Sequence, residues 1–82
     1  MATVTVKLFA AYQEAYGKPE VILEVPSDMT VEKVGDRIRA PFPALHPLAA
    51  ITRYGINLAF VEPNTLVRDG DEIVLIPPVS GG

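Results

Sequence analysis

The segment Thr3–Ala10, with the sequence TVTVKLFA, decides how this chain can fold. Apolar and polar residues alternate along it, and alternation with a period of two predicts a β-strand that is buried on one face. The residues expected on the buried face are Val4, Val6 and Leu8. Phe9 therefore falls on the opposite, outer face of the same strand.

A second alternating segment, Glu72–Ile76 (EIVLI), lies near the end of the chain. Ile73 and Leu75 are expected to face the core, which places Val74 and Ile76 on the outer face. Both alternating segments are suitable central strands. If they pair in parallel, the chain between them is the crossover that carries a helix over the core.

The elements expected between these strands are a short helix at 10–16, a strand at 21–25, a main helix between Thr30 and Pro41, a proline-rich loop at 41–47, and strands near 52–56 and 58–61. Thr30 is a suitable N-cap, and Gly17 and Pro41 end the two helices. This order predicts an α+β fold: a ubiquitin-like β-grasp roll, in which a mixed sheet carries one main helix on one face.

Three residues of the main helix carry further expectations. Gly35 lies in the middle of the helix, where glycine costs about 1 kcal/mol relative to alanine, so we expect it to permit close packing on the sheet. Arg37 and Arg39 point in different directions from the helix and are expected to be solvated.

Composition narrows the class of protein. The 82 residues, of which 49% are apolar and 21% charged, suffice for one small domain. A net charge of −3 with scattered basic residues predicts no nucleic-acid partner and no membrane partner. No apolar run approaches the ~20 residues of a membrane span, and the alternating N-terminus is unlike a signal peptide. A cytoplasmic protein is therefore expected.

Cysteine is absent, and histidine occurs once, as His46. The absence of cysteine excludes a disulfide framework, a thiolate metal site and a cysteine nucleophile. His46 lies among prolines and is interpreted as an ordinary loop residue. Asp69 and Asp71 flank Gly70 and are interpreted as part of a turn, not as calcium ligands. No metal and no bound cofactor are predicted.

The last six residues, Pro77-Pro-Val-Ser-Gly-Gly82, carry the functional signal. The two prolines favour an extended exit from the sheet, so we divide the chain into a β-grasp domain at 1–77 and an extended, flexible tail at 78–82. Gly81 and Gly82 lack Cβ atoms and can pass through a narrow channel. A carboxylate at the tip is a candidate substrate for ATP-dependent activation. The competing interpretation is an inert terminus.

The segments VKLFA at 6–10 and DGDEIVLIPPVSGG at 69–82, together with Asn57, give the chain a specific resemblance to a known family. It resembles the ubiquitin-like sulfur carriers that serve as small subunits of molybdopterin synthase. The resemblance extends over the whole chain. Leu58 departs from it, because many members have a smaller or polar residue after the asparagine; a tight type I′ hairpin is therefore not expected here.

The resemblance implies a function for the tail. Gly82 would be adenylated by a dedicated activating enzyme that uses ATP, converted to a thiocarboxylate, and would donate its sulfur to a pterin precursor within the large catalytic subunit. Val79, Ser80 and Gly81 would be gripped by these partner enzymes. The small subunit would form a heterotetramer with the large subunit and would itself be non-catalytic.

Other functions stay open at this point. The same chemistry serves sulfur carriers of thiamine synthesis and of tRNA thiolation, although the Pro-Pro-Val-Ser-Gly-Gly ending favours molybdopterin. A ubiquitin-like modifier that is conjugated to lysines, or a non-covalent β-grasp adaptor, belongs to a different functional class.

Four apolar residues are expected to meet on the outer face of the sheet: Phe9, Phe60, Val74 and Ile76. A small acidic monomer does not ordinarily leave such a group in water, so it predicts a docking surface. The resemblance implies that this face docks on the large subunit. The alternative is that these residues cap the sheet edge beneath the proline-rich loop.

Overall fold

The structure, a computed structural model, describes residues 1–78. Its elements are β1 (Ala2–Leu8), α1 (Ala11–Tyr16), β2 (Glu20–Val25), α2 (Val31–Arg39), the 3₁₀ helix η1 (Pro43–Ala50), β3 (Arg53–Ile56), β4 (Ala59–Val61) and β5 (Glu72–Ile76). The predicted short helix, main helix and strands are confirmed, with small shifts at their ends.

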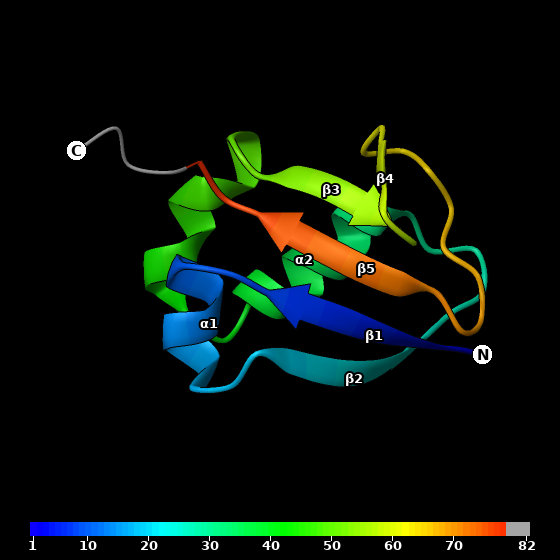
Figure 1. Cartoon of the computed structure of the whole chain (residues 1–82), viewed down its shortest axis with the longest axis horizontal. Helices are drawn as coiled ribbons and strands as arrows, with labels where there is room; N and C mark the ends of the chain where they lie inside the picture. The colour runs from blue at the N-terminus through cyan, green and yellow to red at the C-terminus, as the bar shows by residue number, and fades with distance from the viewer. Residues whose placement is uncertain (79–82) are drawn as a thin grey trace.

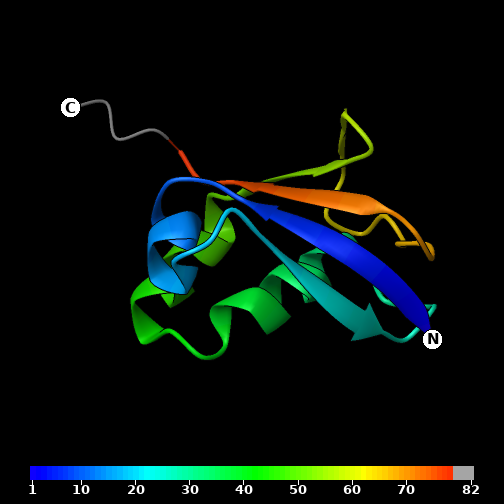
Figure 2. The ribbon, with the colours of Figure 1, turned by 60° about the horizontal axis from the view of Figure 1, so that its bottom comes forward.

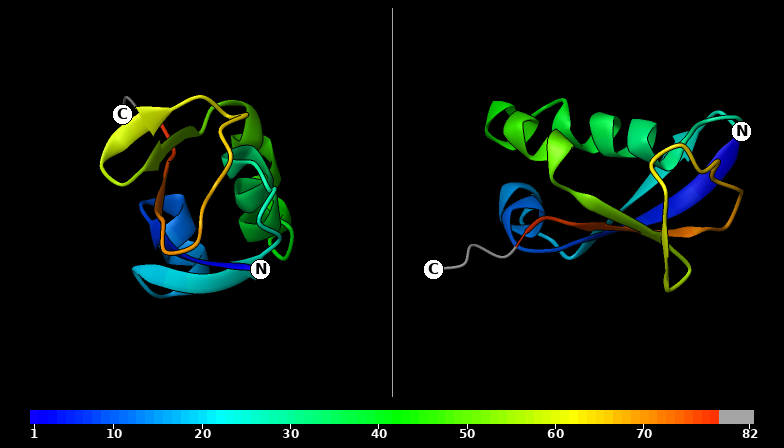
Figure 3. Two further views of the ribbon diagram at one scale, coloured as in Figure 1. Left: turned by 90° about the vertical axis from the view of Figure 1, so that its right-hand side faces the viewer. Right: turned by 90° about the horizontal axis from the view of Figure 1, so that it is seen from above.

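The strands form one mixed sheet in the order β2-β1-β5-β3-β4 (Figure 1). β1 and β5 pair in parallel, as predicted, and the other neighbouring strands are antiparallel. The helices lie on one side of the sheet, and within residues 1–78 no helix covers the other side (Figure 3). The α+β roll with its main helix on one face is therefore confirmed.

The core lies between this sheet and the helices. The predicted inner faces of β1 and β5 are confirmed, since Val4, Val6, Ile73 and Leu75 are almost completely buried. α2 covers them with an apolar stripe made of Val31, Val34 and Ile38. Its N-terminus is capped as predicted, because the Thr30 hydroxyl oxygen accepts a hydrogen bond of 3.2 Å from the Lys33 amide.

At Gly35, α2 packs closely against the Tyr54 side chain of β3. A Cβ atom at this position would lie 2.9 Å from Cε1 of Tyr54 and 3.1 Å from both terminal nitrogens of Arg39. Atoms cannot pack this closely, so a larger residue would push α2 away from the sheet. The predicted role of this glycine is confirmed.

The prediction that Arg39 is solvated is wrong, because its side chain is only 3% exposed. Its guanidinium donates hydrogen bonds to the hydroxyl of Tyr12 (3.0 Å), the hydroxyl of Tyr54 (3.1 Å) and the carboxylate of Asp36 (2.8 Å). Burial opposes the charge, but these hydrogen bonds outweigh it and raise the pKa of Arg39. A buried cation thus links α1, α2 and β3. Arg37, in contrast, is exposed.

The proline-rich segment is also more regular than predicted. Instead of a loop, Pro43–Ala50 forms the 3₁₀ helix η1. Pro43 stands in its first turn, where a fixed φ suits a helix and the missing amide hydrogen is not needed. Leu45 is buried against the core and anchors the segment beside α2.

Candidate functional site

The four predicted outer-face residues lie together on the side of the sheet that the helices leave bare. Phe9, Phe60, Val74 and Ile76 are named the outer-face patch here, and all four line one shallow hollow of about 250 Å³. Phe60 is 72% exposed and Phe9 is 46% exposed. The alternative interpretation, that the proline-rich segment covers these residues, is therefore wrong. η1 packs on α2, on the helical side.

The register of the sheet explains why these residues meet. Gly55 of β3 is paired with Phe60 of β4 on one side and with Val74 of β5 on the other, so all three share a face. Gly55 has no side chain to fill the space between its neighbours, and a Cβ there would lie 3.6 Å from that of Val74. The floor of the hollow is consequently backbone, and its walls are apolar side chains.

The turn between β3 and β4 differs from the prediction. Ile56 pairs with Ala59, which leaves a two-residue loop in which Asn57 has φ = 49° and Leu58 has φ = 72°. Positive φ at both positions is the signature of a type I′ hairpin turn, the type that Leu58 was expected to disfavour.

Asn57 stabilises the turn between β3 and β4 through hydrogen bonds to Glu72, at the start of β5, and to Asp71, just before it. Its side-chain oxygen accepts a 3.0 Å hydrogen bond from the Glu72 amide, and its side-chain nitrogen donates a 3.0 Å hydrogen bond to the Asp71 carboxylate. The Asn57 amide also donates to the carbonyl oxygen of Glu72 at 2.9 Å. These bonds hold the turn on the start of β5 in spite of Leu58.

Leu58 is a residue of this candidate site that sequence reasoning missed. It lines the same hollow as the outer-face patch and is 94% exposed. The signal in the sequence is an apolar residue next to asparagine in a predicted turn, and by itself this signal indicates only an obstacle to a tight hairpin.

Charged side chains flank the apolar surface. Lys7 is paired with Val74 across the sheet and forms a 2.6 Å ion pair with Glu20 of β2. The hydrogen bond and the charge of Glu20 raise the pKa of the Lys7 ammonium. An apolar centre with a charged rim is the usual anatomy of a protein–protein interface.

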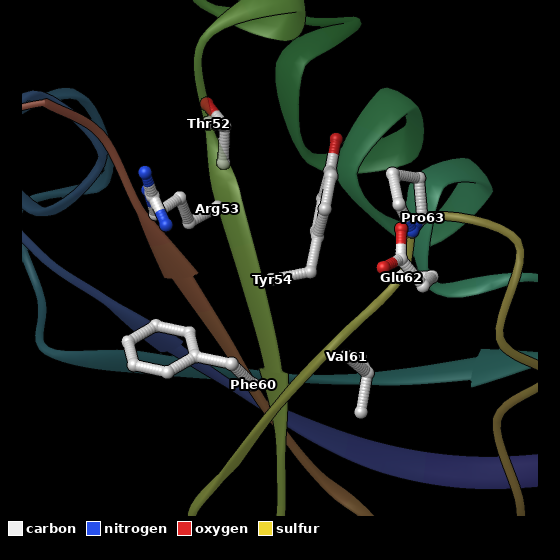
Figure 4. Close-up of a pocket in the computed structure, with 7 residues that line it drawn as sticks. All are labelled: Thr52, Arg53, Tyr54, Phe60, Val61, Glu62 and Pro63. Carbon is white, nitrogen blue, oxygen red and sulfur yellow. The ribbon is translucent and has the colours of Figure 1, made fainter.

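A second hollow, of about 370 Å³, opens where β4 diverges from β3. Figure 4 shows Phe60 and Arg53 on one side of β3 and Tyr54 on the other, toward α2. Phe60 lines both hollows, whereas the rest of this lining is mixed in polarity. Burial raises the pKa of Tyr54, even though its hydrogen bond from Arg39 opposes that shift.

The described residues offer little for catalysis or metal binding. Across residues 1–78, no three His, Cys, Asp or Glu side chains gather closely enough to hold a metal ion. His46 is exposed in η1, with Nε2 3.4 Å from the carbonyl oxygen of Ala40. Asp69 and Asp71 belong to a turn in which Gly70 has φ = 86°, as predicted. None of the helices in this part of the chain has the length and apolar character to span a membrane.

The predicted tail residues Val79, Ser80, Gly81 and Gly82 lie outside the described residues. The structure does show where they begin. Ile76 ends β5 and lines the patch hollow, and Pro77 and Pro78 follow it directly. The outer-face patch is thus next to the root of the tail. The boundary between a domain at 1–77 and a tail at 78–82 stays a prediction.

Comparison with known proteins adds three similarities. Residues 6–82 match the ThiS family. The chain is 33% identical over 79 residues to a molybdopterin synthase sulfur carrier subunit of Arabidopsis thaliana, which covers 96% of this chain and 82% of that protein. Among solved structures, the small archaeal modifier protein SAMP1 of Haloferax volcanii is 29% identical, with a TM-score of 0.82 over 99% of this chain and 100% of that one.

A further solved structure is a complex of subunits 1 and 2 of the molybdopterin-converting factor of Helicobacter pylori. One of its chains is 25% identical, with a TM-score of 0.65 over 98% of this chain and 99% of that chain. The β-grasp fold is common to these proteins, and the similarities extend over nearly the whole chain.

Proposed function

The chain belongs to the ThiS family, and on that premise we propose that it is the sulfur carrier of molybdenum cofactor biosynthesis, acting as the small subunit of a molybdopterin synthase. The observation that carries this proposal is the full-length similarity to proteins of that name, together with the Gly81-Gly82 ending.

Gly82 carries the reacting group. Its carboxylate oxygen attacks the α-phosphorus of ATP in an activating enzyme, which forms an acyl adenylate and releases pyrophosphate. Sulfur at the oxidation level of sulfide, supplied as hydrosulfide, then attacks the acyl carbon; the C–S bond forms as the bond to AMP breaks, and a thiocarboxylate remains. A carboxylate is a poor electrophile, and adenylation supplies the good leaving group.

The second half of the cycle takes place in the large subunit. The thiocarboxylate sulfur forms a C–S bond to a carbon of the pterin precursor as an oxygen leaving group departs from that carbon. Water then attacks the acyl carbon and breaks the acyl C–S bond, which leaves the sulfur on the pterin and restores the carboxylate of the carrier. The carrier contributes no acid or base, in keeping with its predicted non-catalytic role. A thiocarboxylate is ionised and nucleophilic at neutral pH for the same reason that a low-pKa thiol is reactive.

The outer-face patch docks on the large subunit. Support comes from its exposure, its apolar centre and its charged rim, and from the relative of this chain that forms a complex of subunits 1 and 2. Gly82 lies four residues after Pro78, which limits the reach of the acyl group to about 14 Å from Pro78. When a partner is bound to the patch, the acyl group therefore lies no more than about 14 Å from Pro78, next to the bound partner.

Intact mass spectrometry tests this function. The full chain is incubated with the activating enzyme, ATP and a sulfur donor, and exchange of one oxygen for sulfur adds about 16 Da. Deletion of Gly82, or addition of one residue after it, should abolish this gain and leave the melting temperature nearly unchanged, because the core is built from residues 2–75. Cofactor synthesis by the extended variant without prior trimming would refute the assignment.

A second candidate function is attachment to other proteins. The similarity to the modifier SAMP1, at a TM-score of 0.82, favours it. The same mass experiment separates the two functions, since conjugation adds the mass of an entire protein. A chain that acquires only sulfur is a carrier, and a chain recovered on lysines of other proteins is a modifier.

A further inference from the structure

Leu58 combines two features that are unfavourable in an isolated chain. Its φ of 72° lies in the left-handed region, where the Cβ of an L-residue crowds the following carbonyl oxygen. Glycine is the usual residue at the second position of such a turn. Its side chain is also 94% exposed, so packing within residues 1–78 does not offset this strain.

The position of Leu58 indicates a role for its exposed side chain in binding. The turn between β3 and β4 projects from the sheet on the side away from the helices (Figures 2 and 3). There Leu58 borders the hollow that the outer-face patch lines. It therefore extends the apolar surface outward, at the end of the hairpin that carries Phe60.

We propose that Leu58 is a specificity-determining anchor of the docking surface and inserts into an apolar pocket of the large subunit. The inference rests on the proposed function, because it takes the partner from there. Because the Leu58 side chain protrudes beyond the shallow hollow, a complementary partner surface must have a pocket that accepts it. Continuity with the patch and closeness to the tail root favour the large subunit as the occupant. The net charge of −3 opposes a second copy of the same acidic chain.

Replacement by glycine separates binding from folding. Leu58→Gly removes the side chain and relieves the left-handed strain, so the melting temperature should stay the same or rise. Binding to the large subunit should weaken by about 10- to 100-fold, the effect of leaving one leucine side chain out of an apolar pocket. Calorimetric titration of the full chain into the purified large subunit gives the affinity, and scanning calorimetry gives the melting temperature.

Two further variants make the test specific. Leu58→Ala removes most of the side chain but keeps the strain, and it should weaken binding to a similar extent. Ile22→Ala is the matched control, because Ile22 is 67% exposed on the same face of the sheet but belongs to β2, at the opposite edge from β4. Its affinity should equal that of the wild type.

Each other outcome overturns the inference. If the wild type binds the large subunit and Leu58→Gly binds equally well, Leu58 is no anchor, and the proposed function stands. If the wild type does not bind, both fail. A fall of more than about 4 °C in the melting temperature of Leu58→Gly would show a structural role instead. Self-association of the wild type that Leu58→Gly abolishes would identify a second copy as the occupant.

Discussion

Replacing Phe60 by aspartate tests the docking surface most directly. Phe60 is 72% exposed, and a phenylalanine that buries about 200 Å² when fully enclosed would lose about 140 Å² of accessible surface in a tight interface. At ~25 cal/mol per Å² this removal from water is worth about 3.5 kcal/mol. Ordering the side chain costs about 0.5–1.5 kcal/mol, which leaves about 2–3 kcal/mol, or roughly 30- to 150-fold in Kd.

Phe60→Asp should lose at least this much affinity for the large subunit, because the carboxylate must also be desolvated. The fold should persist, since the wild-type side chain is mostly in water. Calorimetric titration measures the affinity, and circular dichroism with thermal unfolding confirms the fold. Ile22→Asp is the control, with a similarly exposed residue on the same face at the far edge of the sheet. Wild-type affinity of Phe60→Asp, or unfolding that precedes the loss of binding, would refute the reasoning.

Three further predictions concern the tail and the core. Gly81→Val should fold normally but give no 16 Da gain in intact mass, because a β-branched side chain does not fit a channel shaped for glycine; a normal thiocarboxylate yield would contradict this. Arg39→Lys should lower the free energy of unfolding in urea by about 1–3 kcal/mol, because an ammonium cannot reach the three partners of the planar guanidinium; an unchanged midpoint would contradict it. Burial raises the pKa of Tyr54 above its ordinary value of 10.0. Above pH 10 the unfolded chain therefore binds fewer protons than the folded chain, and the free energy of unfolding should fall as pH rises. Tyr54→Phe should make that fall shallower, and an unchanged slope in alkaline unfolding experiments would argue against it.

The parts of the fold that depend on local periodicity could be predicted from the sequence. The period of two in β1 and β5 assigns Val4 and Ile73 to the core, and it assigns Phe9 and Val74 to the outer face. Each assignment needs only the neighbouring residues, because side chains alternate along any strand. The outer-face patch was predictable for the same reason.

The buried state of Arg39 depends on residues far away in the sequence. The hydroxyl groups that accept its hydrogen bonds belong to Tyr12 and Tyr54, which are 27 and 15 positions away. Helical periodicity places Arg39 on a face of α2, but it does not reveal that two phenols face the same point. An arginine whose environment is set by tertiary contacts cannot be assigned from its own segment.

The prediction for the β3–β4 turn was wrong for a related reason, because contacts distant in the sequence also determine this turn. Turn propensity at Asn57-Leu58 disfavours positive φ at the leucine, and propensity is a local quantity. The bonds that hold the turn run from Asn57 to Asp71 and Glu72, 14 and 15 positions later. A local preference was thus overridden by contacts that form only when β3 and β5 pair.

The same strand, β5, determines how the docking surface and the tail are placed relative to each other. The start of β5 holds the hairpin turn through Asn57, its middle and end supply Val74 and Ile76 to the patch, and Pro77 follows directly. Because β5 is paired on both sides, by β1 and by β3, these three features cannot shift independently. A partner that binds the patch is therefore also held in a fixed position relative to Pro77, where the last residues of the chain begin. If Gly82 carries the sulfur as proposed, docking at the patch limits where its acyl group can react and directs the sulfur to one site.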